Sequence, residues 1–442
     1  MRAATALAVL VLGPASMARA GAFEVEGFGP EGVAEINARA ARADDGTAAF
    51  YNPGGLGLGR GVRLTIAPTL GVSSLAAQGK TLALADPFGV ALAFDATIPF
   101  EGPLKDRIRL GFAGYLPPTA ALHLIAHPAD RPFFPYYDNR TQRLLLVPAL
   151  AVRVLDGLAI GVGFNVLGGV SGPASVTAGA SGAPEPRIDL DAATSVAVNA
   201  GLRFDPRPGL RFALAFRQRF AAPVVVDSTA QIAGAPLAIA VVTHSALFDP
   251  TTFIAAVSVD RGHAAVELDA SYARWSAYQG PWVSVRATLP GVDVRSALPT
   301  SIARDVVSLR GAGTYRFDVG ARSELVVRAS GGFEPTMLES AQQGPTNLVD
   351  GDKLLAGLGV TLALRGVLPA TATLRLGAGA NVQRVLPSTQ SKRVCAVAPC
   401  GPDTVAGPDA TQPGQGITNP GYPRLTGGGA FWSLSLGVGV DL

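Results

Sequence analysis

The sequence predicts an all-β protein: a transmembrane antiparallel β-barrel of about 14 strands with an N-terminal hatch (plug) inside the lumen. Three observations predict this fold. The 442 residues are 48% hydrophobic and only 16% charged, which is too apolar for an ordinary soluble domain. The chain contains no uninterrupted apolar run long enough for a membrane-spanning helix, which needs about 20 residues. Apolar residues instead alternate with small or polar ones, as in membrane-spanning strands.

The first segment, residues 1–20, has the features of a signal peptide. Arg2 supplies the positive charge, a short apolar run covers 3–13, and Ala18-Arg19-Ala20 forms a cleavage site. The apolar run is too short to cross a bilayer. We therefore expect export, with Gly21 as the first residue of the mature chain.

Alternation is clearest at the C-terminus, where Leu434, Leu436 and Val438 fall on one face and Ser433 and Ser435 on the other. A soluble β-sandwich would alternate in a similar way. The connections favour the barrel, because short turns alternate with long loops, as in outer-membrane barrels. Strands are expected at 61–73, 86–98, 107–116, 141–155, 158–170, 188–204, 210–222, 250–260, 263–275, 303–317, 323–333, 352–366, 371–386 and 429–442. Long loops are expected at 117–140, 171–187, 223–249, 276–302, 334–351 and 387–428.

The segment 21–60 precedes the predicted barrel, 61–442, and shows no strand pattern. A barrel of this size encloses a lumen that its own side chains cannot fill. The stretch Asn52-Pro53-Gly54-Gly55 supplies a tight reversal, because proline fixes φ and glycine permits positive φ. We therefore expect 21–60 to be a hatch in the lumen, with these four residues as its turn.

The N-terminal block resembles the FadL-type transporters of long-chain fatty acids, a family that includes the toluene transporters. The matching residues are Ala43-Asp44-Asp45, the small run 46–49, and Asn52-Pro53-Gly54-Gly55-Leu56. Family members more often have Asn-Pro-Ala, so Gly54 is a departure. Segments 158–169, 269–280 and 305–335 also look like the family.

The resemblance implies a barrel in the outer membrane of a diderm bacterium that transports long-chain fatty acids or other hydrophobic compounds. It implies capture by apolar extracellular loops, a luminal site near the mature N-terminus, and lateral release through a gap in the barrel wall. The family carries its kink in the third strand, where Gly111 and Gly114 lie in this chain. The implied partners are a hydrophobic small molecule and outer-membrane lipid or lipopolysaccharide, and we expect a monomer.

Apolar clusters in the loops are candidates for substrate binding, because such clusters often mark a binding surface. Loop packing, or an aromatic girdle at the membrane interface, is the alternative interpretation. The loop candidates are Phe133, Phe134, Tyr136, Tyr137, Leu237, Ile239, Val241, Leu247 and Phe248. The luminal candidates are Phe23, Val25, Phe28, Arg217 and Arg219.

Charged residues on the predicted luminal face include Glu267, Asp269 and Arg328. Their usual role is to line a wet interior and to hydrogen-bond the hatch. Arginines such as Arg217 and Arg219 are also suited to a bidentate contact with a fatty-acid carboxylate.

Signals for other chemistry are weak. Cys395 and Cys400 lie close together in the longest loop of an exported chain, which predicts a local disulfide. His123 and His127 lie four residues apart, but two histidines are weak evidence for a metal site, and exposure to solvent in a loop is the better interpretation. The net charge is only +3, which argues against nucleic-acid binding. We expect no enzymatic activity, cofactor or metal.

Two alternatives to hydrophobic transport stay open. One is a substrate-selective porin for polar solutes, which would keep an open aqueous channel. The other is a surface-adhesion or structural outer-membrane protein whose long loops bind other cells or phage.

Overall fold

The computed structural model describes residues 22–82, 88–117, 132–137, 144–178, 184–188, 191–232, 235–278, 280, 283–289, 292–295, 303–342, 347–368, 372–392, 404–405, 417–418 and 424–442. Residues 1–20, predicted to be the signal peptide, lie outside this set, as do Cys395 and Cys400. No helix in the described part is long and apolar enough to cross a membrane.

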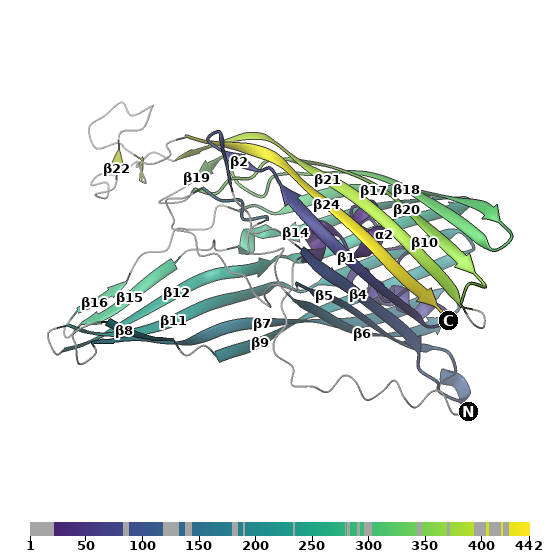
Figure 1. Ribbon diagram of the computed structural model, residues 1–442, viewed down its shortest axis with the longest axis horizontal. Helices are drawn as coiled ribbons and strands as arrows, with labels where there is room; N and C mark the ends of the chain where they lie inside the picture. Colours follow the sequence, from purple (N-terminus) through teal and green to yellow (C-terminus); the bar gives the residue numbers. More distant parts are fainter. Residues whose placement is uncertain are drawn as a thin grey trace.

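The described chain forms a closed antiparallel β-barrel of 14 strands (Figure 1). The ring closes because β1 pairs with β24, with Arg63 opposite Asp441. Every strand predicted from the sequence is present. In their order around the ring, the strands are β1 (Arg63–Ser73), β4 (Phe88–Thr97), β5 (Ile108–Leu116), β6 (Leu145–Leu155), β7 (Leu158–Ala178), β9 (Asp191–Arg207), β10 (Leu210–Arg217), β13 (Thr251–Arg261), β14 (Ala264–Arg274), β17 (Val306–Gly320), β18 (Ser323–Glu334), β20 (Lys353–Arg365), β21 (Thr373–Lys392) and β24 (Arg424–Asp441).

The two faces of the wall differ as the alternation predicts. On β24, the outward residues Leu434, Leu436 and Val438 are about half exposed, whereas the inward Ser433 and Ser435 are buried. Outward leucine, valine and phenylalanine form the surface that an apolar solvent would cover. Small and polar residues face the lumen and leave space there for other parts of the chain.

Short turns join strands at the rim that also carries the C-terminus (Figure 1). Gly157, Gly209 and Gly262 lie in these turns with positive φ of 83°, 78° and 63°, a conformation that glycine adopts without strain. The predicted alternation of short turns and long connections is therefore present in the structure.

Several long connections contain strands that the sequence analysis assigned to loops. β7 continues to Ala178, beyond its predicted end, and β11 (Phe220–Ile232) pairs with this extension in parallel. β12 (Ala235–Asp249), β15 (Val283–Leu289), β16 (Val292–Arg295) and β8 (Pro184–Ile188) complete a sheet that projects from the barrel (Figure 1). Strand pairing does not require the membrane, so β7 does not end where the apolar band ends.

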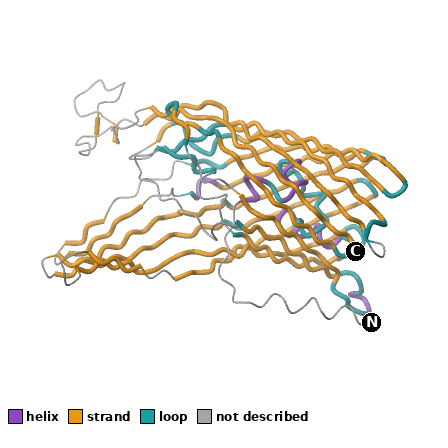
Figure 2. The backbone as a smooth tube through the Cα atoms, viewed as in Figure 1, coloured by secondary structure: helices purple, strands orange, loops and turns teal. Residues whose placement is uncertain are grey.

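The N-terminal helices lie inside the barrel (Figure 2). They are α1 (Ala22–Glu26), α2 (Gly29–Ala34), α3 (Ala48–Tyr51) and the 3-10 helix η1 (Pro53–Leu58). α2 packs against β20, β21 and β24, whereas η1 packs against β6, β7 and β9 on another part of the wall. This segment fits the predicted plug.

Short elements complete the description. They are β2 (Ala76–Ala77), β3 (Lys80–Thr81), η2 (Gly102–Leu104), η3 (Trp275–Ala277), β19 (Ala341–Gln342), β22 (Thr404–Val405) and β23 (Ile417–Thr418).

Candidate functional site: the closed lumen

The predicted hatch turn ties the hatch to the wall. The Asn52 side chain is fully buried; its Nδ2 donates to the carbonyls of Ala40 (2.9 Å) and Leu202 (3.0 Å). Its Oδ1 accepts from the backbone N–H of Gly54 at 3.1 Å. Leu202 belongs to β9, so a single amide joins two hatch segments and the barrel. The wall approaches so closely that a Cβ at Gly161 of β7 would lie 2.3 Å from the backbone of Pro53.

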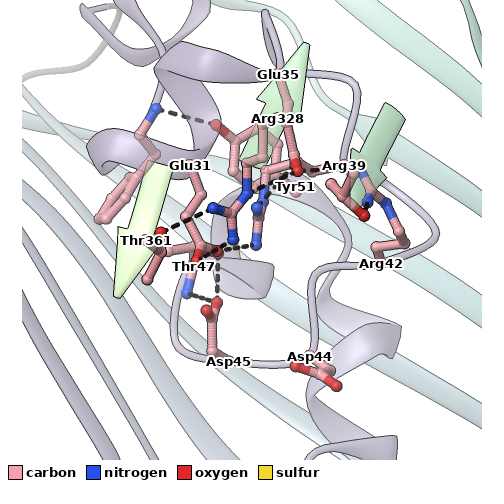
Figure 3. A network of polar contacts seen from close by, with 12 residues as sticks. Glu31, Glu35, Arg39, Arg42, Asp44, Asp45, Thr47, Tyr51, Arg328 and Thr361 are labelled. Atoms are coloured by element: carbon pink, nitrogen blue, oxygen red, sulfur yellow. Dashed lines mark hydrogen bonds and ion pairs between the residues drawn. The ribbon is translucent and has the colours of Figure 1, made fainter. Parts of the chain in front are cut away.

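A network of buried charges fastens the hatch to the opposite wall (Figure 3). Arg39 lies 2.9 Å from Glu31 and 2.8 Å from Glu35. Arg328, which projects from β18, lies 2.7 Å from Glu31 and 3.2 Å from Glu35. Arg42 connects Glu35 at 3.0 Å to Glu267 of β14 at 2.8 Å.

The network sets the protonation of its hatch members. Burial favours the neutral form of the Glu31 carboxyl, but Arg328 and Arg39 outweigh burial and hold its pKa below the usual value of 4.5. Burial also disfavours the Arg39 cation, yet Glu35 and Glu31 raise its pKa. Both groups are therefore charged at neutral pH, and together they form an ionic seal across the lumen.

Glu26, at the end of α1, has the opposite character. It is fully buried, and burial raises the pKa of its carboxyl well above 4.5, with Tyr115 of β5 opposing weakly as a hydrogen-bond partner. Among the described residues Glu26 forms no ion pair, and its burial favours the neutral form of the carboxyl.

Aromatic side chains, mostly from the long connections, pack into a buried cluster that we call the aromatic cap. Tyr137 stacks on Phe431 at 5.3 Å between ring centroids and meets Tyr136 edge-on at 5.0 Å. Phe248 lies 5.1 Å from Tyr278 and 5.6 Å from Trp275. The cap comprises Phe133, Phe134, Tyr136, Tyr137, Phe248, Trp275, Tyr278 and Phe431, all buried.

Backbone and ionic contacts hold the cap in place. Phe133 forms a parallel bridge with Leu348, in which Val349 N–H donates to the Phe133 carbonyl at 2.9 Å. Beneath the cap, the buried Lys353 ammonium lies 4.3 Å from the Tyr136 ring centroid and 3.0 Å from Asp350. A cation over an aromatic face is attracted by the ring quadrupole, so Lys353 supports the cap from below.

A polar cavity of about 60 Å³ lies between the aromatic cap and the hatch. Tyr136 and Trp275 contribute from above, Glu24 and Asn37 from the hatch, and Arg217 from the wall. A second cavity of about 50 Å³ lies between the hatch and β1, β21 and β24, lined in part by Glu31, Arg63 and Arg375. Each cavity holds a few waters at most. The ionic seal is part of the hatch, which lies between the two cavities.

The structure brings the predicted loop and luminal candidates together only in part. Phe133, Phe134, Tyr136, Tyr137 and Phe248 all join the cap, and Val25 packs into the same cluster. Phe28 lies instead between hatch and wall, where its N–H donates to the Tyr51 hydroxyl at 3.0 Å. The side chains of Phe23, Leu237, Ile239, Val241 and Leu247 lie outside the described part of the structure.

The two predicted luminal arginines differ. Arg217 is buried, with its Cζ 4.0 Å from the Phe50 ring centroid, and it donates to the Phe50 carbonyl at 3.2 Å and to Glu24 at 3.4 Å. Arg219 lies beyond the end of β10 at Arg217, and its side chain is exposed rather than buried in the lumen contacts that Arg217 makes.

The predicted wall gap at Gly111 and Gly114 is not found. β5 pairs without interruption on both sides, with β4 from Leu116 to Arg109 and with β6 from Ile108 to Tyr115. A Cβ at Gly111 would lie 2.5 Å from the Leu56 side chain of η1. The glycine there admits the hatch rather than opening the wall.

The sequence analysis missed Trp275, Tyr278, Lys353 and Asp350. Trp275 and Tyr278 lie in the family-like segment 269–280, so an aromatic pair directly after an alternating strand is a signal that could have found them. Lys353 and Asp350 carry no such signal, because only the fold buries them together.

Comparisons with known proteins agree with this architecture. No family model and no curated protein matches the chain. Among solved structures, a FadL homologue of Pseudomonas aeruginosa is similar over 97% of this chain and 100% of its own, with 14% identity and a TM-score of 0.55. The monoaromatic hydrocarbon channel CymD is similar over 94% and 97%, with 14% identity and a TM-score of 0.54. The toluene transporter TbuX of Ralstonia pickettii is similar over 95% and 100%, with 15% identity and a TM-score of 0.52. The likeness to the FadL-type fold that the sequence predicts is thus confirmed in three dimensions.

Proposed function

We propose that this chain is an outer-membrane channel for hydrophobic small molecules. The carrying observation is the aromatic cap: eight buried aromatic side chains close the mouth of a barrel whose outer wall is apolar. Aromatic surface binds apolar ligands without demanding polar partners. Structural neighbours named as a FadL homologue, toluene transporters and a monoaromatic hydrocarbon channel support a transport role over an enzymatic one.

The hatch supports release sideways rather than straight through the lumen. An apolar molecule moving along the axis would meet Glu31, Glu35, Arg39 and Arg328, whose charges satisfy one another in a buried setting. Separating them without water leaves buried charges unpaired, which costs several kcal/mol, on the order of 3–5. A sideways route avoids that cost. The same hatch argues against a general porin, which needs a continuous aqueous channel.

Uptake by whole cells tests the proposal. Cells of a diderm host without its own hydrophobic transporters would express this chain or carry an empty vector, and accumulation of radiolabelled toluene and oleate would be followed. Faster accumulation of either probe with the chain supports transport, and the faster probe identifies the substrate class. If cells with the chain in their outer membrane accumulate both probes no faster than empty-vector cells, the proposal is overturned.

Planar bilayers separate the porin alternative. The intact chain is expected to show little steady conductance, because hatch and cap both close the lumen. A large, steady open conductance would favour a porin for polar solutes.

A further inference from the structure

We propose that the outer wall of the barrel carries a binding site for the lipid A part of lipopolysaccharide, with Arg219 and Arg274 as its phosphate contacts. This inference goes beyond transport and does not depend on it, because the site lies on the lipid-facing surface rather than in the lumen. Three features meet there: two exposed arginines at the rim, a row of aromatic rings beneath them, and a groove in the wall below the rings. Together they match an amphiphile with an anionic head and several acyl chains.

The position of the arginines in the membrane follows from the strand connections. β13 and β14 are joined at Gly262, one of the short turns at the C-terminal rim, so Thr251 and Arg274 lie at the opposite rim. In outer-membrane barrels the short turns face the periplasm and the long loops face the exterior. The lipid beside Thr251 and Arg274 is therefore the outer leaflet, in which lipopolysaccharide is the anionic lipid.

Both arginine side chains lie on the outer face of the wall. Along β14, Arg274 is exposed and shares the outward face with the exposed Tyr272. β10 ends at Arg217, which is buried in the lumen, and the alternation then shifts. Phe220 is buried in the cluster between hatch and wall, so the exposed Arg219 beside it falls on the opposite, outward face.

The backbone holds the two arginines near each other. The Arg219 N–H donates to the Thr251 hydroxyl at 3.2 Å, and Thr251 stands opposite Arg274 in the ladder. Residues directly opposite each other have Cβ atoms about 4.5–5.5 Å apart, and arginine side chains are long. The two guanidinium groups are therefore able to contact one phosphate, or two phosphates of the same headgroup, with the paired N–H donors that suit phosphate oxygens.

The charges around the pair favour an anion. The carboxylate beside it, Asp305, already accepts from the Tyr272 hydroxyl and, at 2.9 Å, from the Ser276 N–H. Arg304, the next residue along the chain, is exposed and adds a third cation to this part of the rim. Positive charge thus exceeds negative charge where the phosphates of lipid A would lie.

An aromatic row lies directly below the arginines. Phe216, Phe253 and Tyr272 stand side by side on β10, β13 and β14. Ring centroids are 5.2 Å apart between Phe216 and Phe253 and 6.4 Å apart between Phe253 and Tyr272. Aromatic side chains are enriched where a membrane meets water. The row therefore marks the level of the headgroups, with the arginines above it and the acyl chains below.

The wall is hollow beneath the aromatic row. Ala255 and Ala270 face each other in the next row of the ladder, and the larger Val257 and Leu268 follow below them. A groove of about 590 Å³ lies at the two alanines, and a second of about 710 Å³ shares both alanines and continues past Gly311. An interfacial aromatic girdle alone needs no groove. Grooves that begin under two arginines instead provide apolar surface for several acyl chains of one lipid.

Lipid binding to the purified full chain tests the site. The chain would be extracted in detergent, freed of bound lipid, and titrated with radiolabelled hexa-acylated lipid A that carries both phosphates. Parallel titrations would use the same lipid after removal of its phosphates, and phosphatidylglycerol. The variants are Arg219→Ala and Arg274→Ala. The matched control is Arg384→Ala on β21, an exposed arginine whose neighbours Gln383 and Val385 are buried, so that it also faces outward.

We expect Arg219→Ala and Arg274→Ala each to weaken lipid A binding by about tenfold, the lower end of the range for hydrogen bonds to charged groups. Arg384→Ala should bind like the parent, and dephosphorylated lipid A should bind the parent at least tenfold more weakly, on the order of one lost charged contact or more. Unchanged affinity in both arginine variants would overturn the site. Phosphatidylglycerol that binds as tightly as lipid A would overturn the assignment to lipopolysaccharide.

A substitution in the groove provides a second readout. Ala270→Trp fills the hollow and leaves both arginines in place, so lipid A affinity should fall on the order of tenfold, the effect of excluding about two methylene groups. The control is Ala378→Trp on β21, where the alanine stands opposite Leu436 on another part of the outer wall. Parent affinity in Ala270→Trp would overturn the role of the groove. Each readout is lipid binding, so a failed site would leave the proposed transport untouched.

Discussion

The two closures of the lumen differ in chemistry. The hatch meets the wall through Arg39, Arg42, Arg328 and their carboxylates, a set of contacts that tolerates little rearrangement without exposing charge. The aromatic cap meets the wall through ring contacts that an apolar ligand is able to replace with contacts of its own. An apolar ligand therefore has a means of opening the upper closure and none of opening the lower one.

The largest effect is expected at the ionic seal. Arg328→Met removes the wall's cation from Glu31 and Glu35, and breaking a buried pair should weaken hatch anchoring by about 4 kcal/mol. Hydrogen exchange of residues 29–43 should accelerate while the barrel strands stay protected. The control is Arg365→Met, whose pair with Glu324 is 3.7 Å long and whose side chain is 61% exposed, so its effect should stay under about 1 kcal/mol. Equal exchange in both variants would refute the seal.

A smaller effect is expected in the cap. Phe134→Ala deletes a fully buried ring and should destabilise the cap by about 3 kcal/mol. Val25 of α1 packs into the cap cluster, but residues 29–43 are fastened by the ion pairs of Arg39, Arg42 and Arg328. The exchange of residues 29–43 should therefore not change. Tyr137→Phe is the control, since it keeps the ring and removes the hydroxyl that donates to Gln383 at 3.2 Å. Faster exchange in the hatch of Phe134→Ala would mean that the two closures are coupled.

The hatch turn should rank third. Asn52→Ala removes the bonds to Ala40, Leu202 and Gly54 and should cost about 2 kcal/mol, because buried backbone groups lose their partner. Leak conductance should rise while the barrel stays intact. Asn52→Asp retains an acceptor for Gly54 but loses the two donated bonds, so it should resemble alanine rather than the parent. An alanine variant with baseline conductance would show that the turn does not hold the hatch.

The smallest effect near neutral pH is expected from protonation of the hatch carboxyls Glu31 and Glu26. The folded pKa of Glu31 lies below 4.5, so its stabilising contribution is complete above that pH and is lost as pH falls toward the folded value. The protection of amides in residues 29–43, measured relative to their intrinsic exchange rate at each pH, should stay constant from about pH 7 to 5 and fall below about pH 4.

Burial raises the pKa of Glu26, so the free-energy cost of keeping this carboxyl buried grows as pH rises above 4.5. Glu26→Gln should therefore protect α1 at pH 7, and an unchanged exchange rate there would contradict a neutral Glu26.

The sequence predicts the wall better than its contents. Alternation identifies strands because their period is local, and Leu434 to Val438 show it directly. The position of residues Phe133 to Tyr137 in the cap depends on the bridge between Phe133 and Leu348. Leu348 lies far along the chain, so no local sequence pattern predicts this position. β10 ends at Arg217, five residues before the predicted end at 222, and no local pattern marks that end. The segment 223–249 is predicted to be a loop because its residues continue past the expected membrane limit.

We expect the pairing of β1 with β24 to be the last step of barrel assembly. The ring is complete only when the last strand of the chain meets the first, and this is the pairing with the greatest separation along the chain, the kind that forms slowest. Before that moment the sheet has two free edges and an open side. The residues that contact the hatch include Leu202 on β9, Glu267 on β14 and Arg328 on β18. The hatch is therefore able to bind the concave face of the open sheet before the ring closes. The final strand would then pair with the first, and the ring would close with the hatch already inside it.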